Sequence, residues 1–346
     1  MKLSATVLNS VVAASAISAV VSFGSTFTPV AQAQTVNGAG ATFPAPLYER
    51  YAREIKKKYP NLSINYQGVG SGAGIRQFIA GTVDFGASDA AMTDAEIAKV
   101  TRGAILVPTA GGAVAVAYNL PGVNNLRLSR KTLPAIFSGQ ITNWNDPQIK
   151  ADNPGVNLPN QAIRPVVRAD SSGTTFIFTN HLSSISPYFK GRVSAGTAPK
   201  WTIANVLRGK GNPGVANLVS RTAGSVGYVE YAFAQANKIN TAQIQNRKGE
   251  YVAPSLQSAN QALSTVNFPD NFRVFVGDPA QGYPIVGLTW LLVYRNYPDT
   301  NKGTAVKNFV NWALTDGQQI NDDLNYTRIP AATVQKVIQT VNSTIK

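Results

Sequence analysis

Residues 168–175, with the sequence RADSSGTT, contain the side chains that proteins use to bind an oxyanion. The apolar pair VV precedes this segment and the apolar run FIF follows it, so we expect a strand to turn into a helix here. At a helix N-terminus the first backbone N–H groups have no intrahelical partner, and the helix dipole favours negative charge. Gly173 allows close approach of the backbone, and the hydroxyls of Ser172 and Thr174 add donors. Arg168 adds a planar, permanently charged donor fork.

The same segment has a second interpretation, because Ser, Thr and Asp before an apolar run commonly cap a helix. Asp170 is ambiguous in the same way, since it could either orient Arg168 or cap the helix. Taken alone, the segment supports the two interpretations equally. The rest of the chain favours both at once, with free N–H groups and cap hydroxyls serving a ligand in place of a capping side chain.

Two further loops have a similar composition, residues 38–43 (GAGATF) and residues 68–74 (GVGSGAG). Each is rich in glycine, contains a hydroxyl side chain, and lies between a strand and a helix or opens a helix. If these helix ends converge, a tetrahedral oxyanion would contact backbone N–H groups, one guanidinium and four hydroxyls. Those hydroxyls belong to Thr42, Ser71, Ser172 and Thr174. Neutral dipoles suffice at such a site because they are oriented in advance.

Asp89, at the polar end of a short apolar segment, determines which anion such a site would accept. A carboxylate beside an anion is repulsive unless the ligand carries a proton that the carboxylate can accept. The site would then accept a protonated phosphate and reject a fully ionised sulfate. The alternative role for Asp89 is an ion pair with a nearby Lys or Arg, and the sequence supports the two roles equally.

The second loop also matches a loose dinucleotide-binding pattern through Gly68, Gly70 and Ala73. Asp89 lies 19 residues beyond Gly70, about where an acid that binds a ribose hydroxyl is expected. The glycine pattern is permissive, however, and an exported protein has poor access to nicotinamide cofactors. We therefore expect no cofactor.

Enzymatic chemistry is disfavoured by the residue types available. Neither Ser71 nor Ser172 lies in a G-x-S-x-G nucleophile elbow, and the chain has no phosphate-binding loop with its lysine. The single histidine, His181, cannot supply the clustered ligands of a metallophosphatase, and the chain has no cysteine. We expect no enzymatic activity and no metal site, with His181 as a surface or cap residue. A secreted phosphatase-like hydrolase with the same phosphate site is the alternative, and a matrix protein that binds polyanions is a third hypothesis.

The chain is strongly basic, with 31 Lys and Arg against 17 Asp and Glu and a formal net charge of +14. Such a balance favours anionic partners through long-range steering. The basic residues are scattered, and the triple run at 56–58 suits the C-terminal end of a helix. A small anion therefore fits better than nucleic acid.

The N-terminal residues 1–33 have the pattern of a secretory signal peptide. Lys2 provides a positive charge, residues 7–21 are apolar and rich in small residues, and Ala31-Gln32-Ala33 is an A-x-A cleavage site. Serines interrupt the apolar run, which disfavours a membrane anchor. We expect a soluble protein of the periplasm, secreted through a cleaved signal peptide and without a lipid anchor, since cysteine is absent.

The first part of the mature chain is predicted to alternate helices and strands. Helix 44–59, strand 62–66, a helix after residue 74 and strand 83–89 give an order that is typical of a parallel sheet with helices on both faces. Ligands of such sheets bind at the carboxyl ends of the strands. Thr93 and Glu96 form a capping box for the next helix, and two buried strands, 104–107 and 113–118, flank Gly111-Gly112.

The middle of the chain predicts a second α/β unit. Its expected elements are helix 131–137, strand 163–167, helix 174–181, helix 213–219, strand 226–229, helix 231–236 and a hairpin turn at 246–249. After Pro284 a buried strand, 285–294, and helices 304–314 and 333–341 have no sheet of their own, so we expect them to return to the first unit. Two crossings, near Gly112 and Pro284, would make a hinge. A simple tandem of two domains is the rival topology, and periodicity cannot decide between them.

Several long motifs resemble those of a known family, the periplasmic phosphate-binding protein of the phosphate ABC transporter. The matching segments are GAGATFPAPLY, NYQGVGSGAGIRQFI, TVDFGASDA, RADSSGTTFIFT and GSVGYVEYA. Together with the strand after Pro284 and the C-terminal helices, the resemblance spans nearly all of residues 36–346. One departure, GAG at 72–74 where members often have a Ser-Gly-Gly run, touches none of the implied contacts.

The resemblance implies a type II periplasmic-binding fold, α/β, with two domains, a two-strand hinge and a ligand cleft between them. Domain I would comprise residues 34–112 and 284–346, and domain II residues 113–283. The implied role is to bind inorganic phosphate as a monomer and to deliver it to the transmembrane permease subunits of an ABC importer, with no nucleic acid as partner. The implied phosphate contacts are Thr42, Phe43 through its backbone, Ser71, Asp89, Arg168, Ser172, Gly173 and Thr174, and Asp170 would pair with Arg168.

Overall fold

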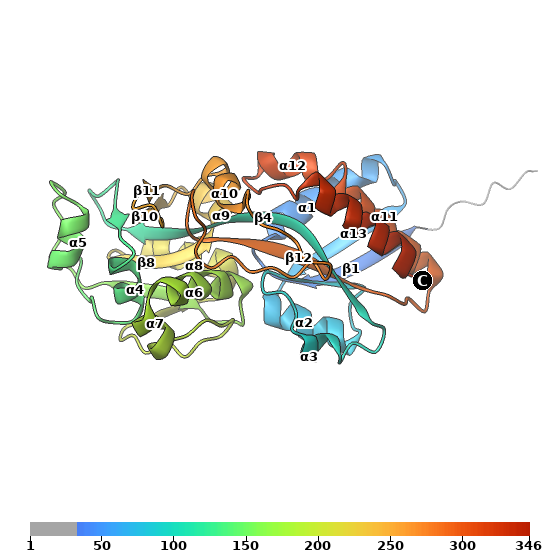
Figure 1. Ribbon diagram of the computed structural model, residues 1–346, viewed down its shortest axis with the longest axis horizontal. Coiled ribbons are helices and arrows are strands. Elements are labelled where there is room, and N and C mark those ends of the chain that lie inside the picture. The colour runs from blue at the N-terminus through green and yellow to red at the C-terminus, as the bar shows by residue number, and fades with distance from the viewer. Residues whose placement is uncertain (1–32) are drawn as a thin grey trace, which may run out of the picture. The chain divides into compact units, whose positions relative to one another are not determined.

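The computed structural model describes residues 33–346 (Figure 1). The predicted signal peptide lies outside the described residues apart from Ala33. Within residues 33–346 the longest helices are too short or too polar to cross a bilayer.

The first part of the sheet is formed by three parallel strands with helices between them. Its elements are β1 (Gln34–Gly40), α1 (Ala45–Glu54), the 3₁₀ turn η1 (Ile55–Lys57), β2 (Leu62–Gly68), α2 (Ser71–Ala80), β3 (Phe85–Ser88) and α3 (Asp94–Ile97). β1 lies between β2 and β3 and runs parallel to both. The predicted alternation is confirmed, but residues 38–40, expected in a loop, are the end of β1. The capping box of Thr93 and Glu96 is confirmed.

Two long strands run through the centre of the sheet. β4 (Ala104–Asn119) was expected as two strands, but it is continuous through Gly111 and Gly112. β12 (Val286–Tyr294) is antiparallel to both β3 and β4. Residues 104–113 of β4 pair with β12, whereas residues 114–119 pair with β8. β4 therefore joins the first group of strands to the second, and Figure 1 shows it beside β12 along the middle of the molecule.

The second part of the chain again contributes three parallel strands to the main sheet. Its elements are β5 (Arg127–Leu128), α4 (Thr132–Phe137), α5 (Pro147–Asp152), β6 (Arg164–Arg168), α6 (Gly173–Ile185), α7 (Pro187–Arg192), β7 (Leu207–Gly209), α8 (Gly211–Arg221), β8 (Ser225–Glu230), α9 (Tyr231–Ala236), β9 (Asn240–Thr241), β10 (Gln243–Gln245), β11 (Tyr251–Val252) and α10 (Leu256–Leu263). β6 runs parallel to its neighbours β7 and β8. β10 and β11 form the predicted hairpin, and β10 also pairs with β5, which gives a small separate sheet.

The C-terminal helices pack against the first part of the sheet. They are α11 (Thr300–Leu314), α12 (Gln318–Asp323), which the sequence did not predict, and α13 (Ala331–Thr344). On α11, Phe309 packs against Phe85 of β3 and Trp312 packs edge-on against Tyr51 of α1, with ring centroids 5.3 Å apart in both pairs. The C-terminal part of the chain thus lies against the first group of strands, where β12 also pairs with β3.

The main sheet within residues 33–346 has the order β2-β1-β3-β12-β4-β8-β6-β7, with β9 paired to β4. Each outer group is parallel, as predicted, and the two central strands run antiparallel to their neighbours. Helices α1, α11, α12 and α13 gather at one end in Figure 1, and α4 to α7 gather at the other. The α/β class is therefore confirmed.

Replacing Phe85 by Ala should lower the free energy of unfolding by about 3–5 kcal/mol, because the ring is fully buried in this core. Phe275 is 45% exposed, so the same deletion there should cost clearly less. Urea denaturation of both variants in phosphate-free buffer measures the difference. Equal losses would mean that the Phe85 ring does not belong to the main core.

Candidate functional site

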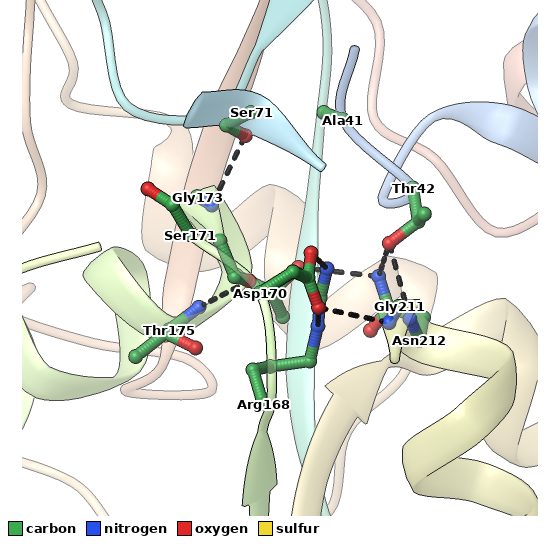
Figure 2. Close-up of polar contacts among 12 residues, drawn as sticks. Ala41, Thr42, Ser71, Arg168, Asp170, Ser171, Gly173, Thr175, Gly211 and Asn212 are labelled. Atoms are coloured by element: carbon green, nitrogen blue, oxygen red, sulfur yellow. Dashed lines mark hydrogen bonds and ion pairs between the residues drawn. The ribbon is translucent and has the colours of Figure 1, made fainter. Parts of the chain in front are cut away.

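Five segments that are distant in the sequence meet at one buried polar site, and Figure 2 labels residues from all of them except the end of β3. They are the turn after β1, the start of α2, the end of β3, the segment from β6 into α6, and the turn from β7 into α8. Within each parallel group, the carboxyl ends of the strands and the N-termini of the following helices lie at the same edge. The two groups run in opposite directions along β4, and their carboxyl ends face each other near its middle, where Glu230 of β8 pairs with Val114. The predicted polar side chains at this site are all buried, namely Thr42, Ser71, Asp89, Arg168, Ser172 and Thr174.

Arg168, the last residue of β6, forms a two-point ion pair with Asp170. Its Nε donates to Asp170 Oδ1 at 2.9 Å and its Nη2 donates to Oδ2 at 2.6 Å. Gly211 N also donates to Oδ1, at 2.9 Å. Burial opposes ionisation of Asp170, but the hydrogen bonds and positive charge of Arg168 prevail and lower its pKa. Asp170 therefore orients Arg168, one of its two predicted roles.

The guanidinium of Arg168 keeps donors available after these contacts. Its side chain is 1% exposed, and Nη1 donates to Thr174 Oγ1 at 3.3 Å. A guanidinium has five N–H donors. Contacts with Asp170 and Thr174 use three of them within the described residues, so one donor on each terminal nitrogen can serve a ligand.

Ser172 occupies the N-cap of α6. Its Oγ accepts a hydrogen bond from Thr175 N at 3.0 Å. The expectation that a ligand takes the place of the capping side chain is therefore wrong for Ser172, which caps the helix itself. Its hydroxyl proton is not used by this contact and stays available as a donor.

Ser71 links the start of α2 to the start of α6. Its Oγ accepts hydrogen bonds from Gly173 N at 3.0 Å and from Asp89 N at 3.3 Å. A Cβ on Gly173 would lie within 2.7 Å of both Asp89 and Ser71, so a residue without a side chain is needed here. Because both lone pairs of the Ser71 oxygen are occupied, the remaining capacity of the hydroxyl is to donate.

Asp89, just after the end of β3, is a buried carboxyl group of the site. Thr289 Oγ1, on β12, donates to Asp89 Oδ1 at 2.9 Å. Within residues 33–346 the structure records no ion pair for Asp89, so the predicted alternative of a neutralising Lys or Arg is not observed. Burial raises the pKa of Asp89 to about 7, although the hydrogen bond from Thr289 and the charge of Arg168 act in the opposite direction. The carboxyl group therefore changes protonation state near neutral pH.

Thr42 and Phe43 form the turn between β1 and α1. Thr42 Oγ1 accepts hydrogen bonds from the backbone N and from Nδ2 of Asn212, both at 3.0 Å. The ring of Phe43 is buried and packs edge-on against Tyr326, with centroids 5.9 Å apart. The hydroxyl of Tyr326 donates to Phe43 O at 2.7 Å, which holds the backbone of this turn in place.

Asn212, near the start of α8, is a site residue that the sequence analysis missed. It is fully buried and contacts both Thr42 and Thr174. A signal for it was present, since residues 209–214 have the sequence GKGNPG and open a helix, as the other loops do. This loop was overlooked because it has no hydroxyl side chain.

Glu230, at the end of β8, is a second buried acid close to the site. Its Oε2 lies 3.0 Å from the hydroxyl of Tyr326, which also contacts Phe43 O. A tyrosine hydroxyl has one proton and a carbonyl can only accept, so both contacts are hydrogen bonds only if Glu230 supplies the second proton. Burial raises the pKa of Glu230 to about 8, which agrees with a neutral carboxyl group.

His181 has a structural role. It is 1% exposed, and its Nδ1 lies 2.8 Å from Gly277 O, so Nδ1 is the protonated nitrogen. Burial lowers the pKa of the imidazole to about 4. The expectation of a surface or cap residue is wrong, because His181 lies on the buried face of α6. Among the described residues no three His, Asp or Glu side chains are grouped to hold a metal.

The site therefore presents several donors and one strong acceptor to whatever it binds. The donors are the hydroxyls and the two remaining N–H groups of Arg168, and the acceptor is Asp89. Such a set fits an oxyanion that carries a proton.

The fold and this site define the class of protein. A family model described as "PBP superfamily domain" matches residues 26–317. Solved structures with similar folds include a high-affinity periplasmic phosphate-binding protein, PfluDING, with a TM-score of 0.72 at 22% identity, covering 89% of this chain and 94% of that one. A phosphate-binding protein from Stenotrophomonas maltophilia gives a TM-score of 0.73 at 21% identity, covering 88% and 93%. The chain has the type II periplasmic-binding fold, as expected.

Curated relatives identify the family within this class. The phosphate-binding protein PstS of Pasteurella multocida is 38% identical over 321 residues, covering 90% of this chain and 91% of the relative. PstS of Haemophilus influenzae is 39% identical over 317 residues, covering 89% and 93%. The chain belongs to the PstS family of phosphate-binding proteins. These relatives are named for binding and not for catalysis, so they lend no support to the hydrolase alternative.

The stability of the ligand-free protein should fall as pH rises from about 4 to about 7. The folded state keeps the proton of Asp89 up to a pKa of about 7, whereas the unfolded chain releases it near 3.8, so unfolding becomes easier as pH increases through this window. Asp89→Asn should make the decline clearly shallower, as measured by urea denaturation across this pH range, and Glu230, whose pKa is raised to about 8, should account for the part that remains. Asp94→Asn, at an exposed carboxyl group, should retain it. An unchanged slope in Asp89→Asn would contradict the protonation assigned to Asp89.

Proposed function

We propose that this protein binds inorganic phosphate and delivers it to the permease subunits of an ABC phosphate importer. One observation supports this most directly: the site combines Arg168, which has two unused donors, with Asp89, a buried acceptor for which residues 33–346 provide no ion pair. Phosphate differs from sulfate in offering a proton to such an acceptor. Membership of the PstS family supports the same conclusion.

Phosphate would be held by groups from both parts of the sheet. The proposed contacts are Thr42, the backbone of Phe43, Ser71, Asp89, Arg168, Ser172, Gly173 and Thr174, with Asp170 orienting the guanidinium. Binding by many fixed dipoles allows an anion to be dehydrated without a large excess of positive charge. None of these groups needs to change covalently, so the ligand can leave unaltered.

The proposed domain division uses the two long central strands. Residues 34–112 and 284–346 would form domain I, and residues 113–283 domain II. In support, β4 changes its pairing partner between Ala113 and Val114. β4 and β12 would then act as the hinge about which the domains close over the ligand.

We further propose that the protein acts as a monomer in the periplasm, after removal of residues 1–33, with no nucleic acid as partner. The signal-peptide pattern and the periplasmic structural relative support the location. The strong positive charge would favour encounter with small anions.

Calorimetric titration at about pH 8 should show sulfate binding roughly 10⁴-fold more weakly than phosphate, because sulfate has no proton for ionised Asp89. At about pH 5.5 the protonated carboxyl group of Asp89 can donate to sulfate, so the difference between the phosphate and sulfate affinities should become smaller. In Asp89→Asn the difference between the two affinities should be small at both pH values, since the amide can donate a hydrogen bond to sulfate. Sulfate binding as tight as that of phosphate at the higher pH would contradict the role of Asp89.

Replacing Arg168 by Ala should weaken phosphate binding by about 2–5 kcal/mol, because a buried charge-assisted fork is lost. Arg168→Lys should give a smaller loss of phosphate affinity, since lysine keeps the positive charge but lacks the planar guanidinium group with its paired donors. Arg164→Ala, at an exposed position of the same strand, is the matched control and should bind like the parent. The proposed role of Arg168 fails if Arg168→Ala binds phosphate as tightly as the Arg164 variant.

A further inference from the structure

Asn212 connects three separate elements at the phosphate site. It follows Gly211 at the start of α8, is fully buried, and contacts the turn after β1, the first turn of α6 and the end of β8. Nδ2 donates to Thr42 Oγ1 at 3.0 Å and to Thr174 Oγ1 at 3.2 Å, and Oδ1 accepts from Glu230 N at 2.9 Å.

These contacts determine the orientation of the Asn212 amide. A backbone N–H can only donate, so the atom that faces Glu230 N must be the carbonyl oxygen. The other atom is then the NH₂ group, and its two protons match the two threonine hydroxyls. Both N–H donors of the amide are thus used by protein groups, and none is left for an anion.

This use of both donors has a consequence for the two threonines. Thr42 Oγ1 accepts from Asn212 N and from Asn212 Nδ2, which occupies both of its lone pairs. Thr174 Oγ1 accepts from Asn212 Nδ2 and from Arg168 Nη1, with the same result. A hydroxyl whose two lone pairs are occupied can form one further hydrogen bond, as a donor.

We propose that Asn212 is a positioning residue that makes Thr42 and Thr174 obligate donors to phosphate without touching the ligand. This inference rests on the proposed function and extends it. A free hydroxyl can rotate to donate or to accept, and would bind a neutral ligand or water as readily as an anion. Asn212 removes that freedom on both sides of the site, and so favours ligands whose oxygens only accept at these two positions.

The affinity of Asn212→Ala for phosphate should fall by about 10- to 100-fold for each hydroxyl that loses its orientation, as expected for hydrogen bonds to a charged group. Calorimetry with inorganic phosphate measures this, with circular dichroism and thermal unfolding as checks of folding. Asn217→Ala, at an exposed position of the same helix, is the matched control and should bind like the parent. If Asn212→Ala does not fold, Asn212→Asp replaces it, since its carboxylate keeps the size and the contact with Glu230 N but turns both hydroxyls away from the ligand.

A double-mutant cycle separates orientation from a merely structural role. In the background Thr42→Val with Thr174→Val, the hydroxyl protons are absent, so Asn212→Ala should cause little further loss of phosphate affinity. A structural role predicts the same fractional loss in both backgrounds, and that result would overturn the inference. The inference would also be overturned if folded Asn212→Ala bound phosphate as tightly as the parent. The same holds for Asn212→Asp if that variant is used in place of Asn212→Ala. If the parent itself binds no phosphate, the proposed function fails first, which the parent titration shows before any variant is made.

Discussion

The buried ion pair of Arg168 and Asp170 is the interaction on which the rest of the site depends. A lone guanidinium in this position would be costly to desolvate and would attract any anion. Asp170 balances this charge and holds Nε and Nη2 of the guanidinium. The remaining N–H groups therefore point into the site in a defined direction. Gly211 N, which also donates to Asp170, brings the start of α8 to the same place and so positions Asn212. The position of one carboxyl group therefore sets the geometry of three loops.

In the proposed mode of binding, charge balance, more than total positive charge, would give the site its selectivity. Arg168 is balanced by Asp170, Glu230 is held neutral, and Asp89 titrates near pH 7. The whole chain has a formal charge of +14, yet the binding groups are mostly neutral dipoles. Surface charge can increase the rate of encounter with anions, whereas the buried donors and the acceptor decide which anion stays. The two tasks are thus performed by different residues.

The sequence predicted most of the elements and the residues of segment 168–175, because glycine, hydroxyl and charged residues at helix starts follow local rules. It failed where non-local contacts decide. Gly111 and Gly112 suggested that the chain leaves the sheet between two strands. Pairing with β12 along one side instead keeps β4 continuous through both glycines. His181 was expected at the surface, since nothing local shows that Gly277 supplies its hydrogen-bond partner. The ion-pair alternative for Asp89 could be decided only once Thr289, 200 residues later, was placed beside it.

The contact between Tyr326 and Phe43 joins residues 283 positions apart, and Tyr51 with Asn321 spans 270. The first turn of the site therefore lacks its support until almost the whole chain has been made. Native pairings of such long range slow folding, because the chain must close a large loop before they form. A polypeptide that cannot complete its core early stays extended for longer after synthesis, and an extended chain is the form that a membrane translocation channel can thread. Late assembly of the pocket would thus suit a protein that folds only after export.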